Sequence, residues 1–322
     1  MDALSDVLKS LRLEGAVYLN AEFTAPWCIK AEHGLDHVRD RLAGADRLLF
    51  FHFFVEGGCK VPLAGGGALE VRAGDVLLFP QGDRQVMGSD LQLAPVEAST
   101  LMRPEAEDEA HVVHLRHGGG GAMTRIVCGY LAARRGVARP LFDALPRVLR
   151  IPMRDAREAG VLHDLLCFGM REALAARPGS ASLLAKLAEL IFIEALRRHV
   201  DALPPEGRGW LAGVRDAQVG RALALLHGDP AHEWTVDELA RRVALSRSAL
   251  AERFAVLVGE PPMQYLTRWR LALAAQSLRA EQGVIARVAE RSGYESNAAF
   301  SRAFKREFGM SPADWRRSAP AG

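Results

Sequence analysis

Hydrophobic and polar positions follow two different periods along the chain, which divide it into a strand-rich part and a helical part. From residue 15 to about 131, short apolar runs alternate with glycine-containing turns. These runs predict strands at 47–55, 68–72, 76–79, 111–116 and 125–131. Short strands with turn signals at regular spacing predict a small all-β barrel or sandwich. Because the remaining apolar residues repeat at helical spacing, the predicted fold class is α+β.

Helical spacing appears first at residues 2–13 and returns after residue 140. The later part predicts helices at 162–175 and 180–200, separated by the breaker sequence Ala176–Gly179. The second of these helices carries an apolar surface wider than one neighbour requires, formed by Leu183, Leu184, Leu187, Leu190, Ile191 and Ile193. This surface can pack against the barrel or form a homodimer interface. Both roles are possible, on different faces of the helix.

Two prolines and two glycines between residues 201 and 209 predict the end of the last of these helices and a linker. The predicted organisation is therefore a cupin-like sensor and dimerisation domain at residues 1–203, a linker at 204–210 and a second domain at 211–322. Within the first domain the barrel is expected at about 15–135 and the helices at about 140–201.

The last third of the chain contains the same pattern twice, at residues 236–254 and 285–304. Each copy predicts a short helix with a small residue midway, a tight turn, and a serine (Ser246 or Ser296) that can cap a second helix. The second helices are expected to bury Leu250, Phe254 and Leu257 in one copy, and Phe300, Phe304 and Phe308 in the other. A single copy is also typical of an ordinary helical bundle. Two copies with polar and basic outer faces favour a pair of helix-turn-helix units that bind DNA.

Six short motifs connect these copies to a known family. They stand at Trp234–Ala240, Ser246–Leu250, Gly259–Leu266, Gly293–Ser296, Phe300–Lys305 and Gly309–Arg316. With them, residues of about 210–318 resemble the DNA-binding domain of the AraC/XylS family of transcription regulators. The resemblance implies that a linking helix, here about 262–280, carries the two units. It also implies that they enter successive major-groove faces on one side of a DNA duplex.

The resemblance also assigns DNA-binding residues by position. The candidates in the first reading helix are Arg247, Ser248, Ala251 and Glu252. Those in the second are Asn297, Ala298, Ser301 and Arg302, with Lys305 and Arg306 on the same polar face. The small residues at 251 and 298 can make only apolar contacts, for example with a thymine methyl group.

The N-terminal part carries a second resemblance. Residues 74–85 are similar to the second sequence motif of cupins, except that Gln85 stands where a histidine is usual. In the first motif His52 and Glu56 match, but Phe54 occupies the place of another histidine. With further short motifs, residues of about 2–200 resemble the cupin sensor domain that precedes this DNA-binding domain in one AraC subgroup. Metal-binding cupins use several histidines and a glutamate, so no metal or other cofactor is predicted.

His52 and Gln85 are instead candidates for an effector pocket. The alternative interpretation of His52 is a core histidine with a single hydrogen bond. His111, His114 and His117 lie close in sequence, but alternate residues of a strand face opposite ways. His111 and His114 therefore do not predict a pair of metal ligands, and a solvated edge strand is the expected structure there.

The four cysteines, Cys28, Cys59, Cys128 and Cys167, lack the spacing of a disulfide framework or a zinc site, which fits a reducing cytoplasm. Each can be an inert core residue. The functional alternative is oxidant sensing at Cys128, Cys59 or Cys28, and Cys128 lies in the Ile126–Gly129 motif of the cupin resemblance. Cys167 falls in an apolar helical stretch and is expected to be packed.

Composition and charge change this picture only slightly. The 322 residues have a net charge of +2, while residues 210–322 hold 16 Lys and Arg against 12 Asp and Glu. This asymmetry favours a basic binding module at the C-terminal end. The first residues lack the basic and apolar regions of a signal peptide, and no run reaches the roughly 18 apolar residues of a membrane span.

The predicted function is a homodimeric, cytoplasmic transcription regulator that is not an enzyme. Its cupin-like domain is expected to sense a small molecule or an oxidant, and to control binding to double-stranded promoter DNA or recruitment of RNA polymerase, as an activator or a repressor. Two alternatives stay open. One is a metal-dependent cupin enzyme with a DNA-binding appendage, against which Gln85 and Phe54 argue. The other is a cupin that serves only as a dimerisation scaffold.

Overall fold

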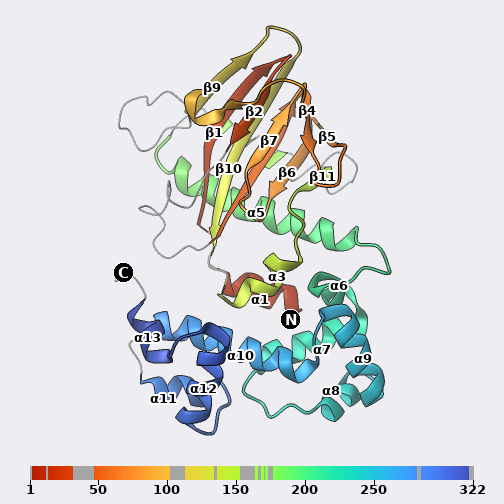
Figure 1. Ribbon diagram of the computed structural model, residues 1–322, viewed down its shortest axis with the longest axis vertical. Helices are drawn as coiled ribbons and strands as arrows, with labels where there is room; N and C mark the ends of the chain where they lie inside the picture. Colours follow the sequence, from red (N-terminus) through yellow and green to blue (C-terminus); the bar gives the residue numbers. More distant parts are fainter. Residues whose placement is uncertain are drawn as a thin grey trace. The chain divides into compact units, whose positions relative to one another are not determined.

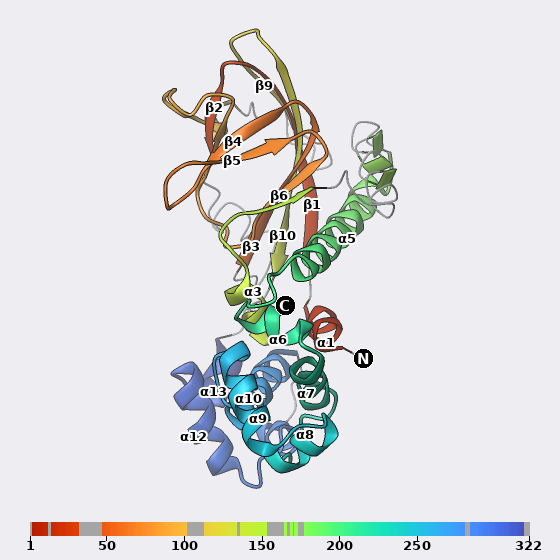
Figure 2. The same ribbon diagram turned by 90° about the vertical axis from the view of Figure 1, so that its right-hand side faces the viewer.

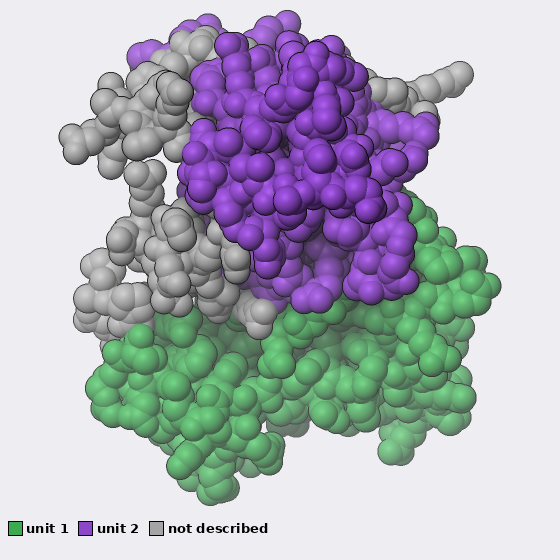
Figure 3. Space-filling view, turned by 45° about the horizontal axis from the view of Figure 1, so that its top comes forward, with its two compact units in different colours: residues 1–12, 134–144, 200–322 green, residues 13–133, 145–199 purple. Residues whose placement is uncertain are grey.

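The computed structural model describes residues 2–11, 14–31, 47–101, 113–133, 136–152, 164–165, 168–169, 171–172, 177–280 and 284–318. The chain forms two compact units, and each unit is assembled from segments that are far apart in the sequence. The helical unit comprises Met1–Arg12, Arg134–Ala144 and Val200–Gly322, and the strand-rich unit comprises Leu13–Ala133 and Leu145–His199 (green and purple in Figure 3).

The strand-rich unit contains two sheets, seen from two directions in Figures 1 and 2. The first sheet has the order β11-β6-β3-β10-β1-β9, with β11 at Leu149–Pro152, β6 at Asp75–Phe79, β3 at Arg47–Glu56, β10 at Met123–Ala133, β1 at Glu14–Thr24 and β9 at Val113–Gly118. The second has the order β5-β4-β7-β2-β8, with β5 at Ala68–Arg72, β4 at Gly58–Pro62, β7 at Gln85–Gly88, β2 at Cys28–Ala31 and β8 at Val96–Glu97. The short helix α2 (Ala98–Leu101) follows β8.

One hydrophobic core is shared by the two sheets. It includes Phe50 and Phe54 from β3 together with Ile29 and Met87 from the second sheet. Strand β3 is buried from Arg47 to Phe54, which explains why its sequence is a continuous apolar run and not an alternating one. The α+β class is confirmed. In the part of the chain that the structure describes, the strands form two sheets with a common core and not one closed ring of strands.

Most of the predicted strands are present, and β9 is an edge strand whose His114 is exposed, as expected. Strand β1 was not predicted from its sequence. Polar residues interrupt it, and its pairing with β10 shifts between Val17 and Leu19, which breaks the two-residue period. Within the predicted helix at 162–175, the described residues 164–165, 168–169 and 171–172 are helical, whereas Cys167 and His111 lie outside the described residues.

Helix α5 (Ser180–Asp201) confirms the predicted long helix of the N-terminal part. Its buried positions include Leu184, Ala188 and Ile191, whereas the side chain of Leu190 is 42% exposed. The guanidinium of Arg198 donates a hydrogen bond to the Pro152 carbonyl at the end of β11, with a distance of 3.3 Å.

The helical unit contains two helix-turn-helix units joined by a 19-residue helix, α10 (Pro262–Ala280). Ahead of α10 lie α6 (Trp210–Arg215), α7 (Ala217–Gly228), α8 (Val236–Arg242) and α9 (Arg247–Val258). After it lie α11 (Ile285–Arg291), α12 (Asn297–Phe308) and α13 (Pro312–Arg317). The predicted linking helix is therefore confirmed over its whole length.

A buried polar cluster joins three helices around the first helix-turn-helix unit. The indole N–H of Trp210 donates to the hydroxyl of Tyr265 (2.9 Å), and this hydroxyl lies 2.7 Å from Nε2 of His227. The His227 ring stacks on Trp269 with a centroid distance of 3.7 Å. Burial lowers the pKa of His227 to about 3, so its imidazole is neutral at physiological pH.

Two N-terminal segments also belong to the helical unit. Helix α1 (Ala3–Ser10) contacts α7, and the 3₁₀ helix η2 (Gly136–Ala138), continued by α3 (Arg139–Ala144), contacts α10. Both segments fall within the predicted sensor domain at residues 1–203. Amphipathic spacing predicts that one face of a helix is buried, but it does not show which element that face packs against. The domain boundary at 204–210 stays a prediction. None of the helices in the described residues is long and apolar enough to cross a membrane.

Candidate DNA interface and sensor cluster

The two helix-turn-helix units have nearly the same turn. After α8 the chain enters the left-handed region at Ala244 (φ 57°), and after α11 it does so at Gly293 (φ 73°). The next amide donates back in both cases, from Leu245 to the Ala240 carbonyl (2.9 Å) and from Tyr294 to the Ala289 carbonyl (3.0 Å). These carbonyls belong to the two small residues that mark the predicted repeat, so the repeat is confirmed at the level of the backbone.

The second helix of each unit begins and ends in the same way. The Ser246 hydroxyl accepts from the Ala249 amide, and the Ser296 hydroxyl accepts from the Ala299 amide, both at 3.2 Å. Both helices are 12 residues long and end at a left-handed glycine, Gly259 or Gly309. Serine capping satisfies one amide of the first turn, and the remaining N–H groups and the helix dipole favour a phosphate at that end.

The buried and exposed faces of the reading helices separate as predicted. Phe254, Phe300 and Phe304 are fully buried, although Leu257 and Phe308 are only half-buried. Most of the predicted DNA-binding residues are exposed: Arg247, Ser248, Glu252, Asn297, Ala298, Arg302, Lys305 and Arg306. Ala251 and Ser301 are half-buried. The structure thus places these residues on α9 and α12; their contact with DNA stays a prediction.

Two ion pairs modify the face of α9. Arg253 holds Asp216, the N-cap of α7, with Nη2 and Nε 2.6 and 3.0 Å from the same carboxylate oxygen. Arg253 is an exposed residue of α9, and its contact with Asp216 makes it a brace between α9 and α7. Arg247 lies 3.3 Å from Asp237 in an exposed pair, which is worth only about 0–1 kcal/mol and can yield to a nucleic acid.

A second cluster lies inside the strand-rich unit and joins three residues that the sequence had named separately. Nδ1 of His52 lies 2.9 Å from the sulfur of Cys128, and its Nε2 lies 2.5 Å from Oε1 of Gln85. Because an amide oxygen only accepts, Nε2 carries the ring hydrogen and Nδ1 accepts from the Cys128 thiol. All three residues are buried.

The sheets explain why these residues meet. His52 and Cys128 are cross-strand partners on β3 and β10, whereas Gln85 lies on β7 in the other sheet. The imidazole therefore bridges the two sheets through their shared core. The pairing of β3 with β10 joins residues 76 positions apart, and no local pattern in the sequence reports such a contact.

Burial dominates the chemistry of the described cysteines, all three of which are free thiols. Burial raises the pKa of Cys128, of Cys28 and of Cys59, with the charges of Asp90 and Asp75 adding to the shifts of the latter two. A stable thiolate is therefore disfavoured at each site. Only Cys128 has a histidine nitrogen among its contacts that can take the thiol proton.

Of the residues at the cupin metal-motif positions, His52 and Gln85 meet, but Glu56 does not join them. Glu56 is exposed at the end of β3 and pairs with Arg125 (3.2 Å), while Phe54 lies in the core. Among the described residues, no group of three or more His, Cys, Asp or Glu is placed to hold a metal ion.

Comparisons with known proteins agree with this architecture. A cupin family model matches residues 2–201, and a helix-turn-helix domain model matches residues 239–318. An AraC-like transcription regulator from Streptomyces antibioticus is 33% identical over 98% of this chain and 99% of its own. The transcriptional regulator AlkR of Acinetobacter baylyi is 30% identical over 99% of this chain and 100% of its own. The RCS-specific transcriptional activator RclR of Escherichia coli is 27% identical over 98% of this chain and 97% of its own.

A double helix-turn-helix unit behind a cupin domain defines a transcription regulator and not an enzyme. The chain belongs to the AraC-like transcription regulators that carry an N-terminal cupin domain. Its C-terminal domain is of the type that binds double-stranded DNA.

Proposed function

We propose that this chain is a cytoplasmic regulator that binds promoter DNA through α9 and α12 and responds to oxidation of Cys128. The observation that carries the sensor part of this proposal is the Cys128–His52–Gln85 cluster, a polar chain inside an otherwise apolar core. A buried polar group needs its partners, so a change at any member disturbs the whole cluster. The RCS-specific activator named above is a relative of this chain.

The cluster supplies the groups that a thiol oxidation requires. The sulfur of Cys128 attacks one oxygen of hydrogen peroxide, the O–O bond breaks, and a sulfenic acid forms. Nδ1 of His52 takes the thiol proton and passes it to the departing hydroxide, which leaves as water. Gln85 accepts from Nε2 and stabilises the transient imidazolium. Fitting an extra oxygen into a close-packed core costs about 1–3 kcal/mol, which biases the sheet toward another arrangement.

Strand β10 offers a route for the signal. It carries Cys128 and ends at Ala133, and the next described element, η2, contacts the linking helix α10 within the helical unit. In the proposed mechanism, a displacement of β10 along its length is passed on to η2. This segment packs against α10, the helix that joins the two helix-turn-helix units. The proposed outcome is a shift in the population that binds the promoter or recruits RNA polymerase.

Oxidation is expected to change DNA affinity roughly 5- to 150-fold, the usual range for coupled sites. The measurement compares reduced protein, protein treated with mild hydrogen peroxide, and treated protein reduced again with dithiothreitol. Cys128→Ser should remove the response, whereas Cys28→Ser and Cys59→Ser serve as matched controls that keep it. A Cys128→Ser protein that still responds like the unmodified chain refutes the redox proposal. Screening of small molecules against the His52 and Gln85 cluster then becomes the next test.

We also propose that the chain forms a homodimer through the exposed side of α5. Leu190 lies on this side and is 42% exposed, whereas Leu184 and Ile191 are buried. Leu190→Arg is expected to convert the dimer to a monomer, because it places a charge in a desolvated apolar contact. Sedimentation velocity measures the change, with Leu63→Arg on the β4–β5 turn as the control, since Leu63 is equally exposed. A Leu190→Arg protein with unchanged mass places the interface elsewhere.

A further inference from the structure

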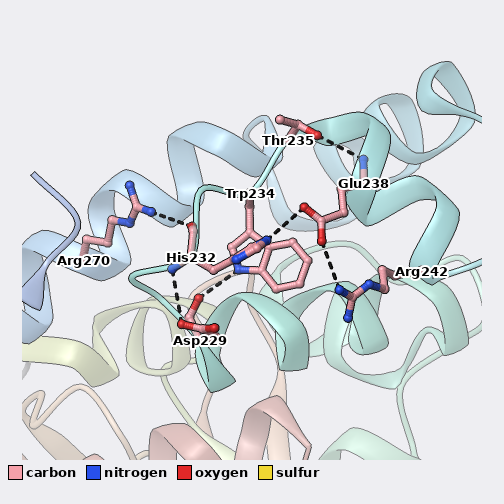
Figure 4. A network of polar contacts seen from close by, with 7 residues as sticks. All are labelled: Asp229, His232, Trp234, Thr235, Glu238, Arg242 and Arg270. Atoms are coloured by element: carbon pink, nitrogen blue, oxygen red, sulfur yellow. Dashed lines mark hydrogen bonds and ion pairs between the residues drawn. The ribbon is translucent and has the colours of Figure 1, made fainter.

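Arg270 lies on α10, midway between the two helix-turn-helix units, and reaches back to the first of them. Its Nε donates to the Pro230 carbonyl (2.5 Å), and its Nη2 donates to the His232 carbonyl (2.9 Å). Both carbonyls belong to the loop between α7 and α8, immediately before the first helix-turn-helix unit. One guanidinium thus fixes the linking helix to the start of that unit; Figure 4 shows its contact with His232.

The loop that Arg270 holds is itself rigidly braced (Figure 4). The Trp234 indole donates to the Asp229 carbonyl (2.9 Å), and the His232 ring contacts Glu238 on α8 (3.0 Å). Glu238 also accepts from Arg242, and hydrogen bonding from His232 is the main cause that lowers its pKa. The two carbonyls that Arg270 contacts therefore have a fixed position relative to α8.

The same guanidinium also meets the second helix-turn-helix unit. A Cβ atom on Gly293 would lie 3.0 Å from Cζ of Arg270, 3.1 Å from its Nη2, and 3.3 Å from the Ala231 carbonyl oxygen. Gly293 is the left-handed residue of the turn between α11 and α12. The turn of the second unit thus packs directly against both Arg270 and the loop of the first unit.

We propose that Arg270 is a positioning residue that sets the separation of the two reading helices, and with it the spacing of the two half-sites on DNA. Two helices that enter successive major-groove faces need a separation close to one helical turn of the duplex, about 34–36 Å. Arg270 joins three parts whose relative positions decide this separation: α10, the α7–α8 loop and the Gly293 turn. The inference rests on the proposed DNA binding by α9 and α12.

The test uses duplexes selected by the unmodified full-length chain from a random-sequence library. One or two base pairs are then inserted or removed between the two protected half-sites. The unmodified protein is expected to lose roughly tenfold or more in affinity for each altered spacing. Arg270→Ala should bind the original and altered duplexes within a few-fold of one another. Lysine lacks the planar guanidinium, so Arg270→Lys cannot contact both carbonyls at once. Its dependence on spacing should be intermediate between those of the unmodified protein and of Arg270→Ala.

Two further variants make the result specific. Gly293→Ala changes the same contact from the other side and is expected to broaden the spacing preference as Arg270→Ala does. Arg221→Ala removes an equal charge from the exposed face of α7 and should keep the sharp preference. Uniform weakening at every spacing, or an unchanged spacing profile in Arg270→Ala, overturns the proposal. Failure of the unmodified chain to select any common sequence contradicts the DNA-binding function instead.

Discussion

Replacing Phe304 by alanine is expected to unfold the second helix-turn-helix unit. The Phe304 side chain is 0% exposed, and its ring contacts Phe300, Phe308 and Trp315 at centroid distances of 5.5, 4.5 and 5.8 Å. Removing a buried phenylalanine costs about 3–5 kcal/mol, because the apolar contacts disappear and the surroundings fill the cavity only in part. This is a large share of the roughly 5–15 kcal/mol that stabilises a typical domain.

Chemical denaturation followed by circular dichroism measures this loss in the full-length chain. Val284→Ala serves as the control, since the Val284 side chain is 66% exposed and its truncation removes little buried area. A Phe304→Ala protein that unfolds at the same denaturant concentration as the unmodified chain contradicts the assigned core. A Phe304→Ala protein that stays folded and loses only a little stability also contradicts the assigned core.

Loss of Arg302 is expected to weaken specific DNA binding by about 1–3 kcal/mol, roughly 5- to 150-fold. Arg302 lies exposed in the middle of α12, on the face that meets a phosphate or base edge in the proposed complex. Arg247→Ala on α9 should have an effect of the same order, reduced by the release of its pair with Asp237. The double variant should lose nearly the sum, because the two residues belong to separate helices.

Competition between the selected duplex and random DNA separates the two roles of an arginine. A residue that contacts bases loses affinity mainly for the selected duplex, whereas one that contacts phosphate weakens both and lowers the salt dependence. Arg221→Ala, at an exposed position of α7, is again the charge-matched control. Unchanged specific affinity in both Arg302→Ala and Arg247→Ala removes α9 and α12 from the proposed interface.

The helical repeat could be predicted closely because its signals are local. Serine caps, small residues at Ala240 and Ala289, and the glycine at 293 each act within a few residues, and the structure places them as the pattern requires. The apolar run of β3 was recognisable for the same reason. Strand β1 was not, because a register shift and interior polar residues hide its period.

Long-range contacts could not be predicted from these patterns. His52, Gln85 and Cys128 were each named as candidates, but their meeting depends on two sheets and on strand pairing across 76 residues. Arg253, an exposed residue of α9, pairs with Asp216 at the start of another helix, and no local pattern in the sequence reports this contact. The packing of α1 and η2 within the helical unit, like the contacts of Arg270, follows from tertiary structure that no spacing encodes.

The most direct test of the central claim is a hydroxyl-radical footprint of the purified full-length chain on the DNA upstream of its own gene. We expect two protected segments about 10 base pairs apart on one face of the duplex, which correspond to α9 and α12 in successive major grooves. The protection should persist in an excess of random DNA. Uniform protection along the duplex, or none that survives this competitor, contradicts the assignment of the chain as a sequence-specific regulator.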